Sequence, residues 1–249
     1  MSTDKYSDIK CHIVAVYHKH KGRLGYRRIT LVLKKLGIII NHKTVLRLMR
    51  QLKLKSMIRL KKYKSYKGEQ GKIAPNILNR EFNTLGPNQK WATDVTEFNV
   101  LGKKLYLSPV IDLFNQEIIS YKISERPDFK SVFDMVKSAV RKTKGDHEIM
   151  LHSDQGWQYQ MRRYQDLLKK SNIVQSMSRK GNCWDNAVME NFFGVVKTEL
   201  FYLKKYRSIN ELKKEIVEYI KYYNNERIKT NLKGMSPIEY RAHHIQINN

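Results

Sequence analysis

The sequence predicts an α/β protein in which a mixed five-stranded sheet is flanked by helices and follows a small helical domain. From residue 91 onward, strand-forming and helix-forming segments alternate in the order β-β-β-α-β-α-β-α, which fits such a sheet. Residues 4–52 instead show helical periodicity interrupted by glycines. The 249 residues suffice for one sizeable domain and a small one. We expect a helical region over 1–60, a basic extended linker over 61–88, the α/β core over 89–205, and a helical extension over 206–249 that packs on the core.

The charge of the chain is strongly positive and unevenly distributed. The formal net charge is +25, and no acidic residue lies between Asp8 and Glu69. A solvated surface normally mixes both signs, so this excess predicts a polyanionic partner, in the first place a nucleic acid. Cys11 and Cys183 are too few for a disulfide framework, no Cys-x-x-Cys or His-x-x-His pair suggests zinc, and no apolar run has membrane length. We therefore expect a soluble cytoplasmic protein without a membrane partner.

Three short helices are expected in the N-terminal region. Apolar residues recur at helical spacing over 4–20, 27–36 and 42–52, with Gly37 ending the second helix and Asn41 capping the third. A helix, a short turn and a second, basic helix form the helix-turn-helix pattern of DNA-binding proteins. An ordinary helical bundle with a basic surface is the alternative. On the first interpretation, the candidate DNA-binding residues here are Arg27, Arg28, His42, Lys43, Arg47 and Arg50.

A basic segment joins this region to the α/β core. Tyr63 and Tyr66 alternate with lysines there, which suits a linker lying along a phosphate backbone. Glycines and prolines recur over residues 68–88, so we expect an extended connection between the two domains.

The α/β core is expected to begin with an antiparallel meander. Strands are predicted over 91–100, 105–113 and 117–123, followed by a helix over 127–141, a strand over 149–153, a helix over 161–170 and a strand over 173–177. A basic loop from Ser178 leads into a last core helix, with Asp185 as its N-cap. Capping-box patterns at Ser208 and Ser236 open two further helices, which we expect to cover the core.

Three acidic residues occupy prominent positions in this core. Asp94 lies within the first predicted strand, Asp154 ends the fourth, and Glu190 lies on the last core helix. For any one of them, a salt bridge, a cap or a turn is the simpler explanation. Three such acids in one fold point instead to hard divalent cations, because two ions can bind both oxygens of an in-line phosphoryl displacement. Gathered acids in a very basic protein predict phosphodiester chemistry.

An ordered set of motifs then resembles one family. The motifs lie at residues 25–30, 41–49, 91–98, 152–159, 178–197, 222–227 and 235–240, which together extend over nearly the whole chain. In these motifs, and in the spacing from Asp154 to Glu190 and on to Lys197, the sequence is similar to bacterial insertion-sequence transposases, specifically to the catalytic subunit encoded by the second reading frame. That family belongs to the RNase H-like, retroviral-integrase-type superfamily, which carries an Asp-Asp-Glu triad.

The resemblance implies roles for individual residues. Asp94, Asp154 and Glu190 would form the catalytic triad and bind two Mg²⁺ or Mn²⁺ ions. Lys197, seven residues after the glutamate, would contact a phosphate of the element end; a solvated helix lysine is the alternative.

Four further residues surround the triad in the sequence. Asn186 would orient Glu190 or a ligand water from one turn away on the helix. His152 would shape the site beside Asp154, although a packed core histidine explains it equally well. Arg179 and Lys180, in the loop before the helix, are candidate DNA contacts.

The resemblance also implies an activity and partners. The expected function is metal-dependent 3′-end cleavage and strand transfer of an insertion element. The expected partners are the terminal repeats and target DNA, an upstream reading-frame protein as partner or fusion, and further copies of the chain on DNA, in the bacterial cytoplasm at the nucleoid. Two alternatives remain: a non-catalytic DNA-binding repressor or modulator of transposition, and an RNase H-like nuclease without strand transfer.

Overall fold

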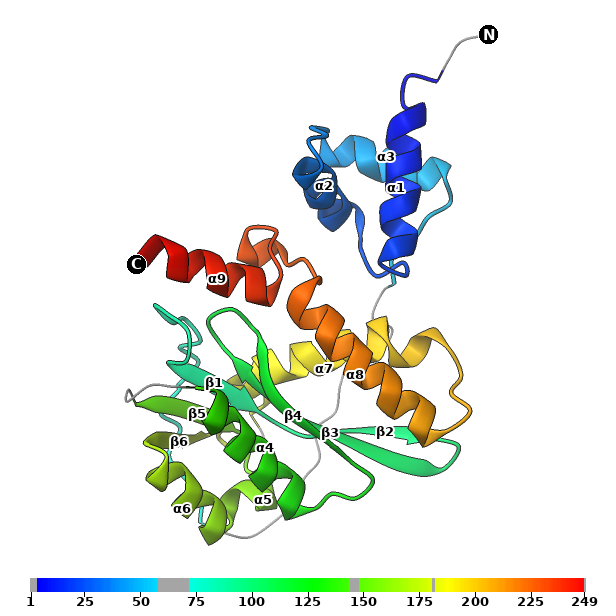
Figure 1. The fold of residues 1–249 in the computed structure, drawn as a ribbon. Coiled ribbons are helices and arrows are strands. Elements are labelled where there is room, and N and C mark those ends of the chain that lie inside the picture. The colour runs from blue at the N-terminus through cyan, green and yellow to red at the C-terminus, as the bar shows by residue number, and fades with distance from the viewer. Residues whose placement is uncertain (1–3, 58–71, 144–147, 181, 249) are drawn as a thin grey trace.

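A computed structural model describes residues 4–57, 72–143, 148–180 and 182–248 of the chain. These residues form a small helical domain and a larger α/β domain, with the C-terminal helices on the side that faces the helical domain (Figure 1). The end of the predicted helical region, residues 58–60, and the first part of the predicted linker, residues 61–71 with Tyr63 and Tyr66, lie outside the described residues.

The N-terminal domain contains the three predicted helices, α1 (Ser7–Lys19), α2 (Tyr26–Lys35) and α3 (His42–Gln51). The Asn41 side chain caps α3 by accepting a hydrogen bond of 2.8 Å from the N–H of Lys43. Gly37 adopts a φ of +83°, which ends α2 as predicted. The helices share one apolar core, whose buried members are Ile13, Val16, Leu24, Ile29, Leu33, Val45, Leu48 and Met49.

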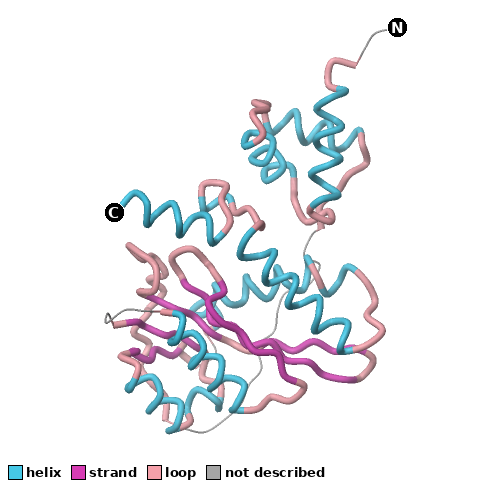
Figure 2. The backbone as a smooth tube through the Cα atoms, in the orientation of Figure 1, coloured by secondary structure: helices cyan, strands magenta, loops and turns pink. Residues whose placement is uncertain are grey.

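A mixed sheet forms the centre of the larger domain (Figure 2). Its strands are β1 (Lys90–Thr93), β2 (Thr96–Val100), β3 (Lys103–Asp112), β4 (Ile118–Ser124), β5 (Ile149–Ser153) and β6 (Ile173–Met177). The order is β2-β3-β1-β5-β6, and β4 pairs with the other edge of β3. Strands β1 to β4 pair antiparallel, whereas β5 is parallel to both β1 and β6. The predicted fold class is confirmed.

The strand count differs from the prediction at one place. The first predicted strand is divided at Asp94, so the described residues form six strands rather than five. The register with β3 continues across the division, since β1 ends opposite Val110 and β2 begins opposite Leu107. Asp94 therefore lies level with Pro109, whose nitrogen carries no hydrogen and cannot donate to the ladder. The interruption follows from this proline.

Helices cover both faces of the sheet. Helices α4 (Phe129–Lys142), α5 (Trp157–Gln160) and α6 (Arg162–Lys170) pack on one face, and α7 (Ala187–Glu199) and α8 (Ile209–Asn225) pack on the other. Consecutive side chains of β1 point to opposite faces of the sheet, so Trp91 belongs to the core on the α4 side and Ala92 to the core on the α7 side. Helix α8 shares its core with α7 and the sheet. Helix α9 (Pro237–Asn248) follows it and contacts α8.

The described part of the predicted linker, residues 72–88, and the start of α7 are more ordered than expected. The described part of the linker packs along β6, where the Ser176 hydroxyl accepts hydrogen bonds of 3.0 Å from the N–H groups of Ile77 and Leu78.

The prediction that Asp185 caps α7 is wrong. A 3-10 turn over Cys183–Asn186 precedes the helix, and the Asp185 side chain is buried in ion pairs. In the described ranges, no helix is both long and apolar enough to cross a membrane.

Candidate active site

Asp94 occupies the interruption between β1 and β2. The residue is 7 % exposed, and its Oδ1 accepts a hydrogen bond of 2.7 Å from the backbone N–H of Val95. The Thr93 hydroxyl donates to the carbonyl oxygen of Pro109 at 2.8 Å, so the end of β1 stays attached to β3. The first predicted acid is thus buried at the end of a short strand rather than within a continuous one.

Asp154 lies beside Asp94 because of the parallel pairing of their strands. Ala92 of β1 pairs with His152 of β5, and each aspartate lies two residues beyond this pair. Both carboxylates therefore lie at the same edge of the sheet. Oδ1 of Asp154 accepts a hydrogen bond of 2.9 Å from the N–H of Gly156, which fixes the turn after β5.

Glu190 lies on α7, which contacts β1. Burial raises the pKa of Asp94 well above its usual value; the charge of Asp154 raises it further, Glu190 adds to this, and the Lys197 ammonium opposes it. Burial also raises the pKa of Asp154. These interactions show that the three predicted acids and Lys197 lie close to one another.

The paired aspartates have the chemistry of a cation site. Among the described residues, the hydrogen-bond donors to both side chains are backbone N–H groups, and no ion pair neutralises either carboxylate. Adjacent buried carboxylates are costly unless a cation or a proton is present, and hard divalent ions prefer such oxygen ligands. In this side-chain arrangement the described part of the chain contains no ready-made group of three or more His, Cys, Asp or Glu ligands. The aspartate pair fits a metal, and Glu190 does not yet complete a cluster with it.

Lys197 lies two turns beyond Glu190 on α7 and is half-buried. Its ammonium lies 5.6 Å from the centre of the Phe98 ring, on the strand that follows Asp94. The side chain therefore lies against the fold beside the acids instead of extending fully into solvent. Its contact with a DNA phosphate stays a prediction.

His152 and Asn186 are both buried, but in different environments. The His152 ring lies between two serine hydroxyls, with Nδ1 2.9 Å from Oγ of Ser176 and Nε2 3.1 Å from Oγ of Ser178. Burial lowers the pKa of His152 to about 4, so the ring is neutral at pH 7. This geometry favours the packed core histidine over a role in the site. The amide atoms of Asn186 have no hydrogen-bond partner among the described residues, and its predicted supporting role is untested.

The loop before α7 is held by an ion-pair cluster that sequence reasoning missed. Asp185 accepts hydrogen bonds from Arg179 (Nε 2.9 Å, Nη2 3.0 Å) and from Nε of Arg80 at 2.9 Å. Asn76 donates to the same carboxylate at 2.9 Å. Arg179, predicted as a DNA contact, is thus engaged within the protein, whereas Lys180 is exposed. The sequence indicates this cluster only by the spacing of Arg179 and Asp185, a basic and an acidic residue six apart in one loop.

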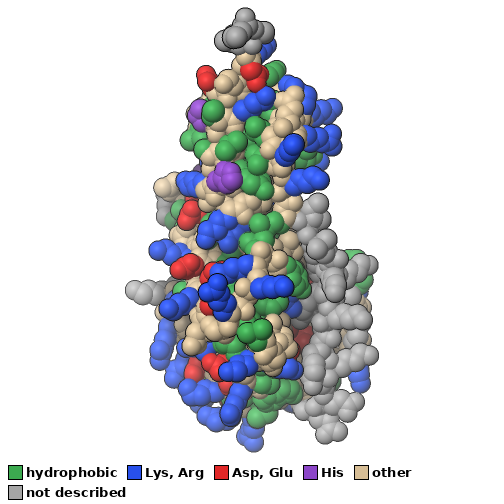
Figure 3. All heavy atoms as spheres, turned by 90° about the vertical axis from the view of Figure 1, so that its right-hand side faces the viewer, with side chains coloured by type: hydrophobic (Ala, Val, Ile, Leu, Met, Phe, Trp, Pro, Cys, Tyr) green, Lys and Arg blue, Asp and Glu red, His purple; other side chains and the backbone are tan. Residues whose placement is uncertain are grey.

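The predicted DNA-binding residues of the N-terminal domain divide into two groups. Exposed side chains are presented by α3 and the start of α2; they are Arg27, His42, Lys43, Arg47 and Arg50. Arg28 is different, because Nη1 lies 3.4 Å from Oε1 of Glu199 and Nη2 donates to the carbonyl of Arg23 at 2.8 Å. On the face drawn in Figure 3, Lys and Arg side chains are more frequent than Asp and Glu. A basic surface fits DNA, while Arg28 joins the two domains.

The order of the strands, the two aspartates at the ends of parallel neighbours and the glutamate-bearing helix across them define an RNase H-like, integrase-type domain. Family models agree. The "Integrase core domain" description matches residues 85–183 and, in a second model, residues 190–245, and an "HTH-like domain" matches residues 4–62. Members of this superfamily generally use divalent metal ions.

Relatives identify the family. The chain is 58% identical over 238 residues to the "Putative transposase InsK for insertion sequence element IS150" of Escherichia coli, covering 96% of this chain and 84% of that protein. It is 38% identical over 230 residues to the transposase for insertion sequence element IS904 of Lactococcus lactis, with coverages of 92% and 91%. The chain belongs to the insertion-sequence transposases with an Asp-Asp-Glu integrase core.

Solved structures show the same fold. The catalytic core domain of HTLV-2 integrase, solved in complex with magnesium, has a TM-score of 0.51 at 16% identity and covers 64% of this chain and 99% of that one. A simian T-cell lymphotropic virus intasome chain has a TM-score of 0.55 at 15% identity and covers 92% of this chain and 74% of that one.

Proposed function

We propose that this transposase cuts the 3′ ends of its insertion element and joins them to a second DNA strand, with Asp94, Asp154 and Glu190 binding two Mg²⁺ or Mn²⁺ ions. The observation that carries the proposal is the adjacency of the two aspartates at the ends of β1 and β5, with the helix of Glu190 packed across β1. When bound, the two ions lower the pKa of the attacking water or 3′-hydroxyl and neutralise charge on the leaving oxygen.

The protein side of this chemistry is positioning and charge. Asp94 and Asp154 present carboxylate oxygens from strand ends, which fixes their separation more precisely than a loop would. Asp94 is buried and Asp154 is half-buried, and a cation there favours the ionised form of both side chains. Glu190 approaches from α7, and the packing of that helix on β1 sets its distance from the pair.

Cationic side chains around the acids are proposed to position the DNA. Lys197 lies on the same helix as Glu190, and Lys180 is exposed at the preceding loop. The exposed residues at the start of α3 would read the terminal repeats, since the second helix of a helix-turn-helix enters the major groove. An upstream reading-frame protein and further copies of the chain are proposed partners, at the nucleoid in the bacterial cytoplasm.

The test is strand cleavage and joining with Mg²⁺ on duplexes that carry the element's own end. Glu190→Gln preserves the shape of the side chain but weakens metal ligation, so we expect at least a hundredfold loss of both activities while DNA binding persists. Glu218→Gln on the exposed face of α8 is the matched control and should behave as the wild type.

Other outcomes point to the alternatives. Cleavage without joining in the wild type would identify a nuclease. Binding without cleavage, even after addition of the upstream reading-frame protein, would leave a DNA-binding repressor or modulator as the function.

A further inference from the structure

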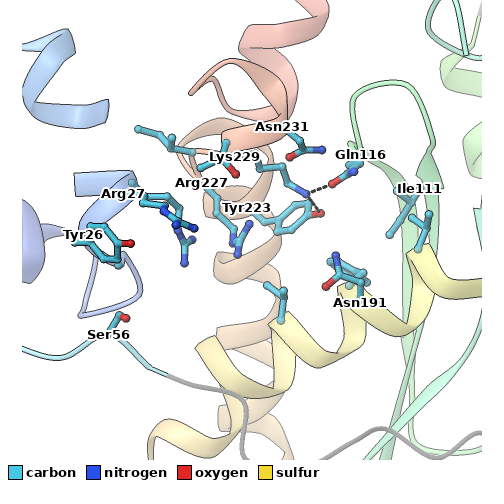
Figure 4. Close-up of a pocket in the computed structure, with 17 residues that line it drawn as sticks. Tyr26, Arg27, Ser56, Ile111, Gln116, Asn191, Tyr223, Arg227, Lys229 and Asn231 are labelled. Carbon is cyan, nitrogen blue, oxygen red and sulfur yellow. Dashed lines mark hydrogen bonds between the residues drawn. The ribbon is translucent and has the colours of Figure 1, made fainter. Parts of the chain in front are cut away.

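A cavity of about 410 Å³ lies between the helical domain and the α/β domain. Its walls come from the start of α2, from one face of α7 and from the segment after α8 (Figure 4). On α7 the cavity is lined by Val188, Asn191 and Val195, and at 100° per residue Glu190 points to roughly the opposite side of the helix. The cavity is therefore separate from the paired aspartates.

Cationic groups from both domains line this cavity. They are Arg27 and Arg28 of α2 and Arg227 and Lys229 after α8, and the described residues of the wall include no acidic side chain. One buried carboxylate behind the wall, Glu199, accepts hydrogen bonds from Arg227 (Nε 2.8 Å, Nη2 2.6 Å) and from Arg28 at 3.4 Å. A single negative charge is thus shared by two guanidinium groups, and the cavity keeps a net positive charge.

Lys229 is the group that most clearly needs an anion. The residue is 7 % exposed, and Nζ donates to two neutral oxygens, Oε1 of Gln116 and the hydroxyl of Tyr223, both at 2.6 Å. An ammonium group has three N–H bonds, so one donor remains. No carboxylate of the described residues lies within ion-pair distance of it. Burial lowers the pKa of Lys229 well below its ordinary value, and Arg227 adds to this, as expected for an uncompensated cation.

The start of α2 supplies further donors. Gly25 is the N-cap and lines the cavity, no side chain caps the helix, and its first turn contains no acidic residue. Such a helix end presents unpaired backbone N–H groups and a partial positive charge, which together bind anions. Arg27 is exposed and has no hydrogen bond or ion pair among the described residues. Figure 4 shows Tyr26 and Arg27 on the side of the cavity opposite Gln116.

We propose that this cavity binds one phosphate group of the DNA backbone, held between the start of α2, Arg27 and Lys229. DNA is favoured over a free anion because the cavity lies close to α3. Tyr26 of α2 lines the cavity, and its ring stacks on His42 of α3 with centroids 5.9 Å apart. His42 begins the helix expected to enter the major groove, and neighbouring elements of a helix-turn-helix contact the backbone. The inference rests on the proposed action on DNA and adds a phosphate contact shared by the two domains.

The test is a scan in which single phosphates of an element-end duplex are replaced by uncharged methylphosphonates. One position should weaken binding by the wild type about tenfold but cause no further loss in Arg27→Gln or Lys229→Met. Each variant should also reduce the slope of log affinity against log salt by about one. Arg27 is exposed, so its variant stays folded even if Lys229→Met does not.

Lys137→Gln, an exposed lysine of α4 on the far face of the sheet, is the charge-matched control and should keep the wild-type methylphosphonate pattern. The proposal is overturned if every methylphosphonate affects the variants as much as the wild type. It is also overturned if inorganic phosphate raises the wild-type Tm in an Arg27-dependent manner while no DNA position distinguishes the proteins. Cleavage is measured separately, so its absence in the wild type would count against the proposed function and leave the binding comparison intact.

Discussion

Asp94 and Asp154 are placed by single residues next to them. Pro109 interrupts the ladder opposite Asp94, and Gly156 donates its N–H to Asp154. A Cβ at position 156 would lie 2.9 Å from Oδ1 of Asp154 and 2.6 Å from Nε2 of Gln158. Gln158 ends in a flexible amide that can move, but the carboxylate is fixed at the end of β5. Any side chain at position 156 therefore displaces the acid.

Gly156→Ala is expected to lower the cleavage rate about a hundredfold, since displacements of about 1 Å in a catalytic group have effects of that size. DNA binding should be unchanged, because the substitution leaves the cationic surfaces as they are. Single-turnover cleavage with Mg²⁺ measures the effect. Gly86→Ala is the control, because a Cβ there meets its nearest atoms at an ordinary 3.7 Å. Equal rates for the two variants would contradict the explanation.

At the scale of elements, the loop before α7 is fixed from both sides. Asp185 at its end is fully buried, and it joins Arg179 at the loop start to Arg80 of the segment that packs along β6. Hydrogen bonds from Arg179 lower the pKa of Asp185 despite its burial, and Arg80 contributes in the same direction. The loop therefore delivers α7, and with it Glu190, at a defined position on the sheet.

Asp185→Asn should lower the free energy of unfolding by about 1–3 kcal/mol at pH 7, because charged hydrogen bonds to a buried group are lost. The folded pKa lies below the unfolded one, so the wild-type advantage is complete above about pH 4 and is lost as the pH falls through the folded pKa. Urea unfolding from pH 7 to pH 2 measures this loss, which begins below about pH 4. If the difference in the free energy of unfolding between the two proteins grew toward acidic pH, the explanation would be contradicted.

At the scale of the whole molecule, α7 joins the active site to the helical domain. Glu190 lies near its start and Glu199 at its end, about 13 Å apart along the axis. Glu199 accepts hydrogen bonds from Arg28, Arg227 and, at 2.9 Å, the Tyr219 hydroxyl, while Nε of Arg23 donates to its carbonyl at 2.9 Å. Although burial opposes it, Arg227 and Arg28 keep the pKa of Glu199 below its usual value.

Glu199→Gln should destabilise the protein by about 3–5 kcal/mol, because it leaves buried guanidinium groups without their counter-charge. The two domains should also separate more easily, which would increase the radius of gyration measured by small-angle scattering. Glu97→Gln removes an exposed ion pair with Lys104 and should cost less than about 1 kcal/mol. Similar losses in both variants would show that Glu199 does not join the domains.

The fold class and the grouping of the acids could be predicted from periodicity, spacing and resemblance. The division at Asp94 could have been predicted too, since Pro109 lies inside a central strand, but only once its register was known. The spacing of Arg179 and Asp185 could have indicated their pairing, but the other partners of Asp185 and Glu199 could not be predicted. Arg80, Arg28 and Arg227 are far from these acids in the sequence, and ion pairs leave no periodic signal. For the same reason the sequence predicts a DNA contact for Arg28, whereas the structure pairs it with Glu199.

The Glu199 cluster has a consequence for engineering. The helix-turn-helix is the natural unit to exchange between relatives when a transposase is to be directed to another element end. Here the unit carries Arg23 and Arg28, whose partners belong to the catalytic body. In a chimaera whose N-terminal domain comes from a donor without both arginines, the buried Glu199 at the end of α7 would have fewer positive charges around it. To direct this enzyme to another element end, the exchanged DNA-binding domain must therefore keep Arg23 and Arg28, which contact Glu199.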